Sequence, residues 1–394
     1  MPEMRYDPIH DIWVIVAEER LCRPDQFTSE RFGFCQNRDV NDISRLAEEQ
    51  KEKCPFCEGN ESQTPRERDA LARRKDRISS EEYSEESREC SEIIYAEKSE
   101  HDQGCVGFCR ERTIDDYRRP NSPGWQVRSV PNRYPSVLPW GEMTSQRFGI
   151  HEKTLAVGAQ EVIVDTPRHL ERFGEMTEEE FQYLIHFYHR RLYQLRKEHR
   201  WQYVQLFKNQ GAAAGASMCH IHSQIFCLPY VPHTINMEAY GLEKYFQNTG
   251  QCYYCQSLHQ ELTDRWRFIA ESETMAAFCP FTSRFHGEIW VMPKRHVPCF
   301  VQSSREELDD LSLFLRKIIC RLEQVIPVPT YNVVLRQSPW RYEESGVVLD
   351  ERFHWRLEIL PRLNGIAGFE WGTGNFINPC SPERFAAEMV SRSP

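Results

Sequence analysis

The sequence lacks any apolar run of the 18 or more residues that a membrane helix needs. Its start, MPEMRYDPIHDIWVIVAEER, also lacks the charged, apolar and small-residue sections of a signal peptide. Positive charge is outnumbered: 49 Lys and Arg stand against 59 Asp and Glu, a formal charge of −10. No large basic field is therefore available to neutralise a nucleic-acid backbone. We expect a soluble, cytoplasmic protein that binds neither membrane nor nucleic acid; a small phosphate-bearing ligand needs only a few local cations.

Cysteine, in contrast, is plentiful. The chain has 15 cysteines, an odd number that argues against a complete set of disulfides. In a long cytoplasmic chain, paired cysteines indicate metal or redox chemistry more often than disulfides. Its 394 residues, 40% of them hydrophobic, suffice for two to three domains or for one duplicated fold.

Residues 78–122 differ in composition from the rest of the chain. They are acidic, polar and poor in aliphatic side chains, which predicts an exposed insertion that could be mobile. Cys90, Cys105 and Cys109 lie in this segment. Their scattered spacing favours free thiols over a third metal site.

Strand and helix patterns are clear in the rest of the first half. Residues Ile12–Val16 predict a strand, and QEVIVDTPRH predicts another that ends at His169. The stretch from 176 to 198 carries apolar residues at helical spacing behind a capping box of Thr177 and Glu180. A strand at 203–207 and a glycine-rich turn then lead into GASMCHIHSQIFCLP, residues 215–229.

The second half repeats this order, which indicates an internal duplication. Aligning His169 with His296 and His220 with His354 superimposes five further pairs: Glu161 on Glu288, Val164 on Val291, Arg168 on Arg295, Gln224 on Glu358 and Ile225 on Ile359. We therefore predict an α+β fold of two similar units, residues 1–235 and 236–394. Each unit would lay helices against a mainly antiparallel sheet, and the first would carry the chemistry.

The alternation of His220, His222 and Gln224 would place three polar groups on one face of a strand. Such a face could bind a metal, attack a phosphate, or satisfy a polar core. In the second half His354 matches the first histidine, whereas Arg356 replaces His222. The first histidine therefore belongs to a role that both halves share, and the second to a role that only one half has.

The shared role is predicted to be zinc binding. Each half contains a C-x-x-C pair, whose two thiolates can reach one tetrahedral ion, and two matched histidines would complete each site. The two predicted ligand sets are Cys54, Cys57, His169 and His220 in the first half, and Cys252, Cys255, His296 and His354 in the second. Both sites would be closed and structural, and iron could replace zinc in the second. The alternatives are a redox C-x-x-C pair or coincidentally buried cysteines.

The unique role falls to His222. A lone histidine on a strand is often only a satisfied core group. Here it follows NQGAAAGAS, whose small residues let an anion approach the backbone N–H groups. A neutral imidazole attacks phosphorus and leaves well afterwards, which suits transfer through a covalent intermediate. Gln224 could donate a hydrogen bond to a phosphoryl oxygen.

At H-x-H-x-Q the chain resembles the galactose-1-phosphate uridylyltransferase branch of the histidine-triad superfamily. The other matching segments are RLCRPDQF, CPFCEGN, VRSVPNRYP, EVIVDTPRH, NQGAAAGAS and GFEWGTGNFINP. The resemblance implies a duplicated fold, bound zinc, a homodimer and a nucleotidyl-histidine intermediate on His222. Seven positions match substrate-binding positions of the family: Ser217 and Asn209 at phosphate oxygens, Arg20 and Arg23 near the phosphates, Asn132 at the nucleotide, and Phe369 and Glu370 at the hexose.

The sequence departs from the family at several of these motifs. Ile221 replaces the proline of H-P-H, Arg133 follows Asn132, and Asn364 replaces a lysine found in some members. The leading hypothesis is transfer of uridylyl from UDP-glucose to a hexose 1-phosphate, most simply galactose 1-phosphate. The second C-x-x-C and SMCHIHSQ are closer to the ADP-glucose phosphorylase type, which is the alternative. A third hypothesis is a zinc-stabilised binding protein without catalysis.

Overall fold

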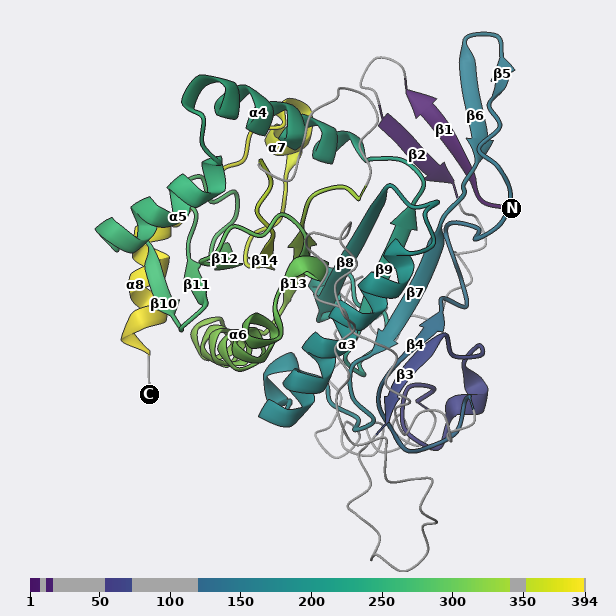
Figure 1. The fold of residues 1–394 in the computed structure, drawn as a ribbon, viewed down its shortest axis with the longest axis horizontal. Coiled ribbons are helices and arrows are strands. Elements are labelled where there is room, and N and C mark those ends of the chain that lie inside the picture. The colour runs from purple at the N-terminus through teal and green to yellow at the C-terminus, as the bar shows by residue number, and fades with distance from the viewer. Residues whose placement is uncertain (8–11, 17–53, 73–119, 341–351, 393–394) are drawn as a thin grey trace, which may run out of the picture.

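The computed structural model describes residues 1–7, 12–16, 54–72, 120–340 and 352–392 (Figure 1). Arg20, Arg23 and nearly all of the predicted insertion at 78–122 lie outside the described residues. None of the helices described has the length and apolarity needed to cross a membrane.

One large antiparallel sheet runs through both halves of the chain (Figure 1). Its strands, in spatial order, are β10 (Phe268–Glu271), β11 (Met275–Phe278), β12 (Ile289–Pro293), β14 (Arg356–Pro361), β13 (Tyr331–Arg336), β8 (Tyr203–Gln210), β9 (His222–Leu228), β7 (Ala159–Val164), β4 (Trp125–Pro131) and β3 (Asp69–Ala72). The halves join where β8 pairs with β13, with Asn209 opposite Asn332. On either side of this joint the strand order is mirrored, so the predicted α+β duplication is confirmed.

A second, smaller sheet lies beside the first half (Figure 1). It has the order β2 (Ile12–Val16), β1 (Glu3–Asp7), β6 (His151–Leu155) and β5 (Gln146–Phe148). The strand predicted at Ile12–Val16 is thereby confirmed. Met4 of β1 is fully buried in a small core of its own, with Val137 and Ala156.

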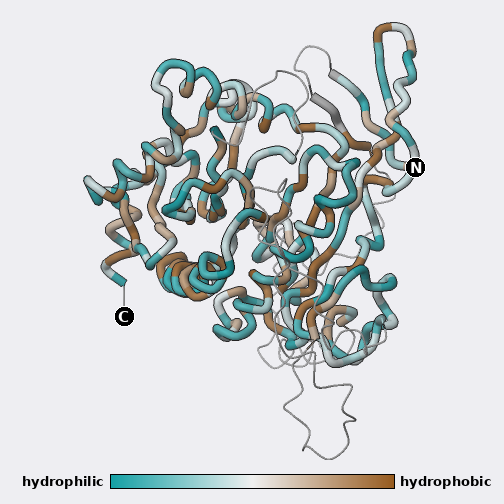
Figure 2. Tube along the Cα trace, in the orientation of Figure 1, coloured by the Kyte–Doolittle hydropathy of each residue, from teal (hydrophilic) through white to brown (hydrophobic). Residues whose placement is uncertain are grey.

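Two long helices, α3 (Glu178–Arg196) and α6 (Arg305–Val325), pack against each other beneath the sheet. Each begins at a complete capping box, Thr177 with Glu180 and Ser304 with Glu307, so the helix start predicted at Thr177 is confirmed. Most apolar residues of both helices are buried in one core with the sheet. Figure 2 shows hydrophobic residues recurring along α6 and along the strands of the large sheet.

Further helices belong mainly to the second half. They are α4 (His233–Thr249), α5 (Tyr253–Asp264), α7 (Gly368–Thr373) and α8 (Pro382–Ser391), with short 3-10 helices η2 (Glu61–Gln63), η5 (Phe173–Glu175), η6 (Ala212–Ala214) and η7 (Phe300–Gln302). Helices α4 and α5 share a second core with Trp290 and Met292, on the sheet face opposite α6. The second half of the sheet is therefore covered on both faces.

The strand register corrects part of the sequence alignment between the halves. Val162 of β7 lies opposite Gln224, whereas Trp290 of β12 lies opposite Glu358, the match of Gln224. Gln160, and not Glu161, therefore occupies the place of Glu288, and Val164 does not superimpose on Val291. The first half has one more residue between this strand and its histidine than the second half has. Because side chains alternate along a strand, this one residue sends Glu161 and Glu288 to opposite faces.

Candidate active site

The loop between β8 and β9 is shaped by glycine. Gly211 and Gly215 have φ angles of +79° and +90°, which other residues rarely adopt. A Cβ on Gly211 would also lie only 2.5 Å from a methyl carbon of Thr330. The loop returns the chain to the sheet at His222, the first residue of β9. His220 therefore precedes the strand, which corrects the expectation that both histidines lie on it.

His222 is held as a neutral imidazole with one available nitrogen. Its Nδ1 lies 2.9 Å from the carbonyl oxygen of His220. Since a carbonyl can only accept, Nδ1 carries the proton and Nε2 keeps its lone pair. Burial lowers the pKa of His222 to about 4, so the ring is uncharged at neutral pH. A neutral imidazole with a bare Nε2 is the form that attacks phosphorus.

Gln224 is oriented by a chain of hydrogen bonds. The backbone N–H and the hydroxyl of Ser136 donate to Gln160 Oε1, at 3.0 and 3.2 Å. Gln160 Nε2 in turn donates to Gln224 Oε1 at 3.4 Å. Gln224 consequently offers its NH₂ end to a ligand. Sequence reasoning missed Gln160, which sits one residue before the glutamate that the alignment singled out.

Two cavities meet at His222. The larger, of about 330 Å³, has apolar side chains in its lining, among them Phe56, Val130, Tyr134 and Val162. Its polar lining residues are Gln63, Thr64, Asn132, Arg133, Ser217, His222 and Gln224. An apolar pocket with a few convergent polar groups is typical of a small-molecule site. The structure therefore brings four predicted site residues together: His222, Gln224, Ser217 and Asn132.

The smaller cavity, of about 220 Å³, contains Asn209, Gln210, Arg172 and Thr330 in its lining, together with His222. Asn332 Nδ2 donates to Asn209 Oδ1 at 2.8 Å, which leaves the Asn209 NH₂ group as a donor. Asn332 comes from β13, so the second half of the chain orients a side chain beside His222.

The first Cys/His set forms a compact cluster beside the nucleophile strand. The four ligand atoms of Cys54, Cys57, His169 and His220 all lie within 4.8 Å of one another. The contacts from sulfur to Nδ1 measure 3.2–3.6 Å. Tetrahedral zinc, with bonds of about 2.3 Å to sulfur and 2.0 Å to nitrogen, gives sulfur–nitrogen edges of about 3.5 Å. His220 Nε2 donates to the Thr166 carbonyl at 2.9 Å, which fixes its ring.

The second set forms a matching cluster in the other half. Cys252, Cys255, His296 and His354 also place their ligand atoms within 4.8 Å of one another. Cys255 Sγ lies 3.1 Å from His296 Nδ1 and 3.4 Å from His354 Nδ1. The contact between the two cysteines lowers the pKa of Cys252 and raises the pKa of Cys255, so the two thiols share one proton more readily than they lose both. Both clusters could hold a metal ion.

Phe369 and Glu370 are not brought to His222. Both lie on α7 in the second half of the chain. Phe369 is half exposed, and the Glu370 carboxylate accepts from the backbone N–H of Ala367, so it caps its own helix. Neither residue lines either of the two cavities at His222.

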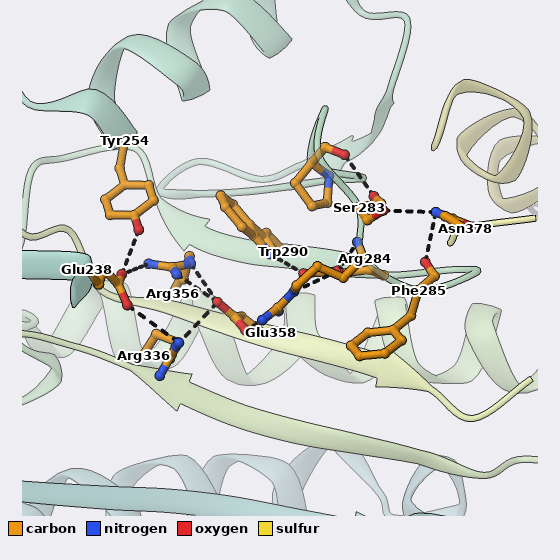
Figure 3. A network of polar contacts seen from close by, with 12 residues as sticks. Glu238, Tyr254, Ser283, Arg284, Phe285, Trp290, Arg336, Arg356, Glu358 and Asn378 are labelled. Atoms are coloured by element: carbon orange, nitrogen blue, oxygen red, sulfur yellow. Dashed lines mark hydrogen bonds and ion pairs between the residues drawn. The ribbon is translucent and has the colours of Figure 1, made fainter. Parts of the chain in front are cut away.

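The corresponding sheet face of the second half holds a network of ion pairs (Figure 3). Arg356, the match of His222, pairs with Glu358 at 2.7 Å and with Glu238 of α4 at 3.0 Å. Arg284 bridges Glu358 and Glu288 at 2.7 and 2.8 Å. Arg356 also lies 4.5 Å from the Trp290 ring. Side chains of this chain thus occupy the space that a ligand would need.

A family model described as a domain of unknown function (DUF4921) matches residues 152–393. ADP-glucose phosphorylase from Arabidopsis thaliana is 29% identical over 390 residues, 98% of this chain and 92% of that protein. Galactose-1-phosphate uridylyltransferase from Thermotoga maritima is 28% identical over 271 residues, 66% of this chain and 82% of that protein.

Solved structures show the same fold. The crystal structure of the Arabidopsis thaliana ADP-glucose phosphorylase with bound ADP-glucose aligns over 100% of both chains with a TM-score of 0.65 and 27% identity. A uridylyltransferase structure aligns over 99% of this chain and 97% of its own with a TM-score of 0.68. At 22% identity, that likeness concerns the fold alone.

Proposed function

We propose a specific reaction for this chain, which belongs to the DUF4921 family and to the galactose-1-phosphate uridylyltransferase family. Members of this kind transfer nucleotidyl groups on hexose phosphates. The proposal is that the chain transfers adenylyl from ADP-glucose to inorganic phosphate through an adenylyl group on His222. The single observation that carries the chemistry is the buried, neutral His222 between two cavities.

In the first step, His222 Nε2 attacks the α-phosphorus of ADP-glucose. The new bond joins nitrogen to phosphorus, the bond from phosphorus to the bridging oxygen breaks, and glucose 1-phosphate leaves. The ring gains a positive charge, and its Nδ1–H bond to the His220 carbonyl strengthens as that charge develops. A phosphate oxygen then attacks the same phosphorus, the nitrogen–phosphorus bond breaks, and ADP is released. His222 returns to its neutral form.

The neighbouring donors suit the charge that develops on the phosphoryl oxygens. Gln224 and Asn209 each present an NH₂ group, because Gln160 and Asn332 engage their carbonyl ends. We assign these two groups, with the Ser217 hydroxyl, to the transferring phosphoryl group. Fixed donors of this kind stabilise a transition state without reorganising during the reaction.

The nucleoside is assigned to the larger cavity. Its apolar wall, with Phe56 and Tyr134, suits the base, and Asn132 and Arg133 supply polar contacts there. ADP-glucose is ranked above UDP-glucose because the ADP-glucose phosphorylase aligns over nearly the whole chain, whereas the Thermotoga maritima uridylyltransferase aligns over two thirds. Uridylyl transfer from UDP-glucose to galactose 1-phosphate is the second candidate, and the similarity to the Thermotoga maritima uridylyltransferase supports it.

Both metal clusters are assigned a structural role with zinc, and iron remains an alternative in the second. Four protein ligands close each site and leave no position for a metal-bound water. In the first half the metal would tie His220 to the C-x-x-C loop, two residues before the nucleophile. The metal would thus fix the backbone just before β9, and His222 would remain the reacting group.

The hexose contacts are assigned to a second copy of the chain. Phe369 and Glu370 line neither cavity at His222 in their own chain. The segment that contains them exposes four large apolar side chains: Phe369, Trp371, Phe376 and Ile377. Such a patch is typical of an interaction surface. In the proposed homodimer, this segment of one copy would complete the hexose site of the other.

A substrate panel tests the proposal. ADP-glucose and UDP-glucose would each be incubated with inorganic phosphate or with galactose 1-phosphate, and glucose 1-phosphate release would be measured. The expected result is at least tenfold higher kcat/KM for ADP-glucose with phosphate than for any other pair. Preference for UDP-glucose with galactose 1-phosphate would select the second candidate. No turnover of any pair would favour the binding protein without catalysis.

A further inference from the structure

A buried polar network lies directly behind the nucleophile, on the sheet face that α3 covers. Lys208 Nζ donates to Asp165 Oδ2 at 2.6 Å, and the Ser223 hydroxyl donates to the same oxygen at 3.1 Å. Tyr188 of α3 lies 2.5 Å from the Ser223 hydroxyl oxygen. Since Ser223 gives its proton to Asp165, Tyr188 is the donor in that contact. The Lys208 ammonium also lies 4.5 Å from the Phe173 ring.

Lys208 reaches the backbone of the nucleophile. Its Nζ donates to the carbonyl oxygen of His222 at 3.3 Å, in addition to its bond with Asp165. His222 is the first residue of β9, directly after the glycine-containing loop. The ammonium therefore binds the main chain where that loop becomes a regular strand. A fixed peptide at this point fixes the Cα from which the imidazole projects.

Stability does not explain this network. The side chains of Lys208 and Asp165 are 3% and 0% exposed, and burying such a pair costs several kcal/mol per ion before the attraction is counted. The second half builds the same layer from apolar residues. Strand register and the matched helices place Leu335 at the position of Lys208, Leu357 at Ser223, Leu315 at Tyr188 and Pro293 at Asp165. The fold is therefore formed without the charged pair in the half that lacks the nucleophile.

We propose that Lys208 is a positioning residue for nucleotidyl transfer, acting through the backbone of His222, with Asp165, Ser223 and Tyr188 holding its ammonium in place. This inference rests on the proposed function. Lys208 lies on the sheet face opposite the cavities and touches no substrate. Its loss should slow formation of the nucleotidyl-enzyme while leaving nucleotide-sugar binding intact, since a displacement of about 1 Å at the reacting atom can cost about 100-fold in rate.

The test compares two double variants of the full-length protein. Lys208→Met with Asp165→Asn removes both charges and leaves neither ion alone in the core. The control, Arg191→Met with Glu161→Gln, removes another buried pair of the same sheet face, in contact at Nε–Oε2 2.8 Å. The two side chains of that pair also contact Ser129 and Gln194, and neither of them lines a cavity at His222. Each double variant removes one buried ion pair, so any effect of general destabilisation on the rate should appear in both.

Three quantities would be measured on each protein: the rate of labelling by ADP-glucose carrying the label in its adenylyl group, the KM for ADP-glucose, and hydrogen exchange of residues 220–225. For the Lys208/Asp165 variant we expect labelling and kcat to fall about 10- to 100-fold, KM to change less than twofold, and exchange to become faster. The control should match the wild type in all three.

Equal slowing in both variants, or in neither, would overturn the inference. A rise in KM with unchanged kcat would also overturn it, because it would indicate a binding role. Failure of the wild type to become labelled by ADP-glucose or UDP-glucose would instead contradict the proposed function. Hydrogen exchange of 220–225 would then still decide whether Lys208 anchors this backbone.

Discussion

The two halves of the molecule share a scaffold and differ in where they place buried charge. Each half has a Cys/His cluster, a capped long helix and five strands in mirrored order. In the first half, buried ion pairs lie on the helix side of the sheet, and the neutral side chains of His222 and Gln224 face the cavities. In the second half, the helix side is apolar and charges fill the opposite face.

The different placement of buried charge explains why a duplicated fold has a reactive site in only one half. Arg356 and Glu358 stand where the first half has His222 and Gln224, and Arg336 stands at the position of Asn209. Both Arg356 and Arg336 pair with Glu238 of α4. A nucleophile and its donors are thus replaced by charges that satisfy one another. The second half keeps the framework and supplies Asn332 to orient Asn209 across the joint.

The largest difference is expected at the position of the nucleophile itself. His222→Asn should lower kcat by at least about 10⁴-fold, since removing a covalent nucleophile costs several orders of magnitude. The matched change in the second half, Arg356→Met, should leave kcat within about threefold. Steady-state kinetics with the preferred substrate pair checks both. Similar decreases in kcat in the two variants would contradict the conclusion that only the first half carries the reactive site.

The metal clusters should behave alike. Cys54→Ser and Cys252→Ser should each remove about one of two metal ions per chain and lower the free energy of unfolding by about 4–5 kcal/mol. Elemental analysis and denaturant unfolding measure the two effects. Transfer by the fraction that remains folded should fall much less than it does in His222→Asn. Metal content unchanged by either substitution would contradict the ligand sets.

Removing one charge from the second-half network should destabilise the protein without slowing transfer. Glu358→Gln leaves Arg356 and Arg284 short of a buried partner, which typically costs about 3–5 kcal/mol. The matched Gln224→Ala should do the reverse and slow transfer about 100-fold with little change in stability. Unfolding curves and kinetics on both variants would show whether the two positions have separate roles.

The same glutamate predicts that the stability of the protein depends on pH. Burial raises the pKa of Glu358, but Arg356, Arg284 and Arg336 outweigh it and lower the pKa from 4.5 to about 2. The folded state therefore binds this proton less readily than the unfolded state. Its contribution, roughly 3 kcal/mol, is present above pH 4.5 and is lost as the pH falls towards 2. Unfolding measured across this range should show a shallower pH dependence in Glu358→Gln.

The smallest effects should be equal in the two halves. Thr177→Ala and Ser304→Ala each remove a capping hydrogen bond, of 3.2 Å in both cases. Each should lower the free energy of unfolding by about 1 kcal/mol. Equal losses in denaturant unfolding would support two equivalent helix starts, and a loss confined to one half would contradict them.

Local patterns in the sequence were sufficient for much of this picture. The capping boxes, the helical spacing after Thr177, the C-x-x-C pairs and the repeated order of elements each depend on residues close in the chain. Strand register depends on pairing between residues that are distant in the sequence. The local sequence therefore did not reveal that the first half has one more residue between β7 and His169 than the second half has between β12 and His296. Lys208 lies one residue beyond the strand predicted at 203–207, and no local pattern marks it, because its burial depends on Asp165 and Tyr188, which lie elsewhere in the sequence.

The most direct test of a single reactive half is the site and amount of covalent labelling. The full-length protein would be incubated with ADP-glucose labelled in its adenylyl group, without phosphate, then digested and analysed by mass spectrometry under conditions that preserve phosphoramidates. We predict one adenylyl group per chain, attached to His222, and its transfer to phosphate on addition. Adenylyl on any residue of the second half, or phosphate-dependent turnover with no label on His222, would contradict this account.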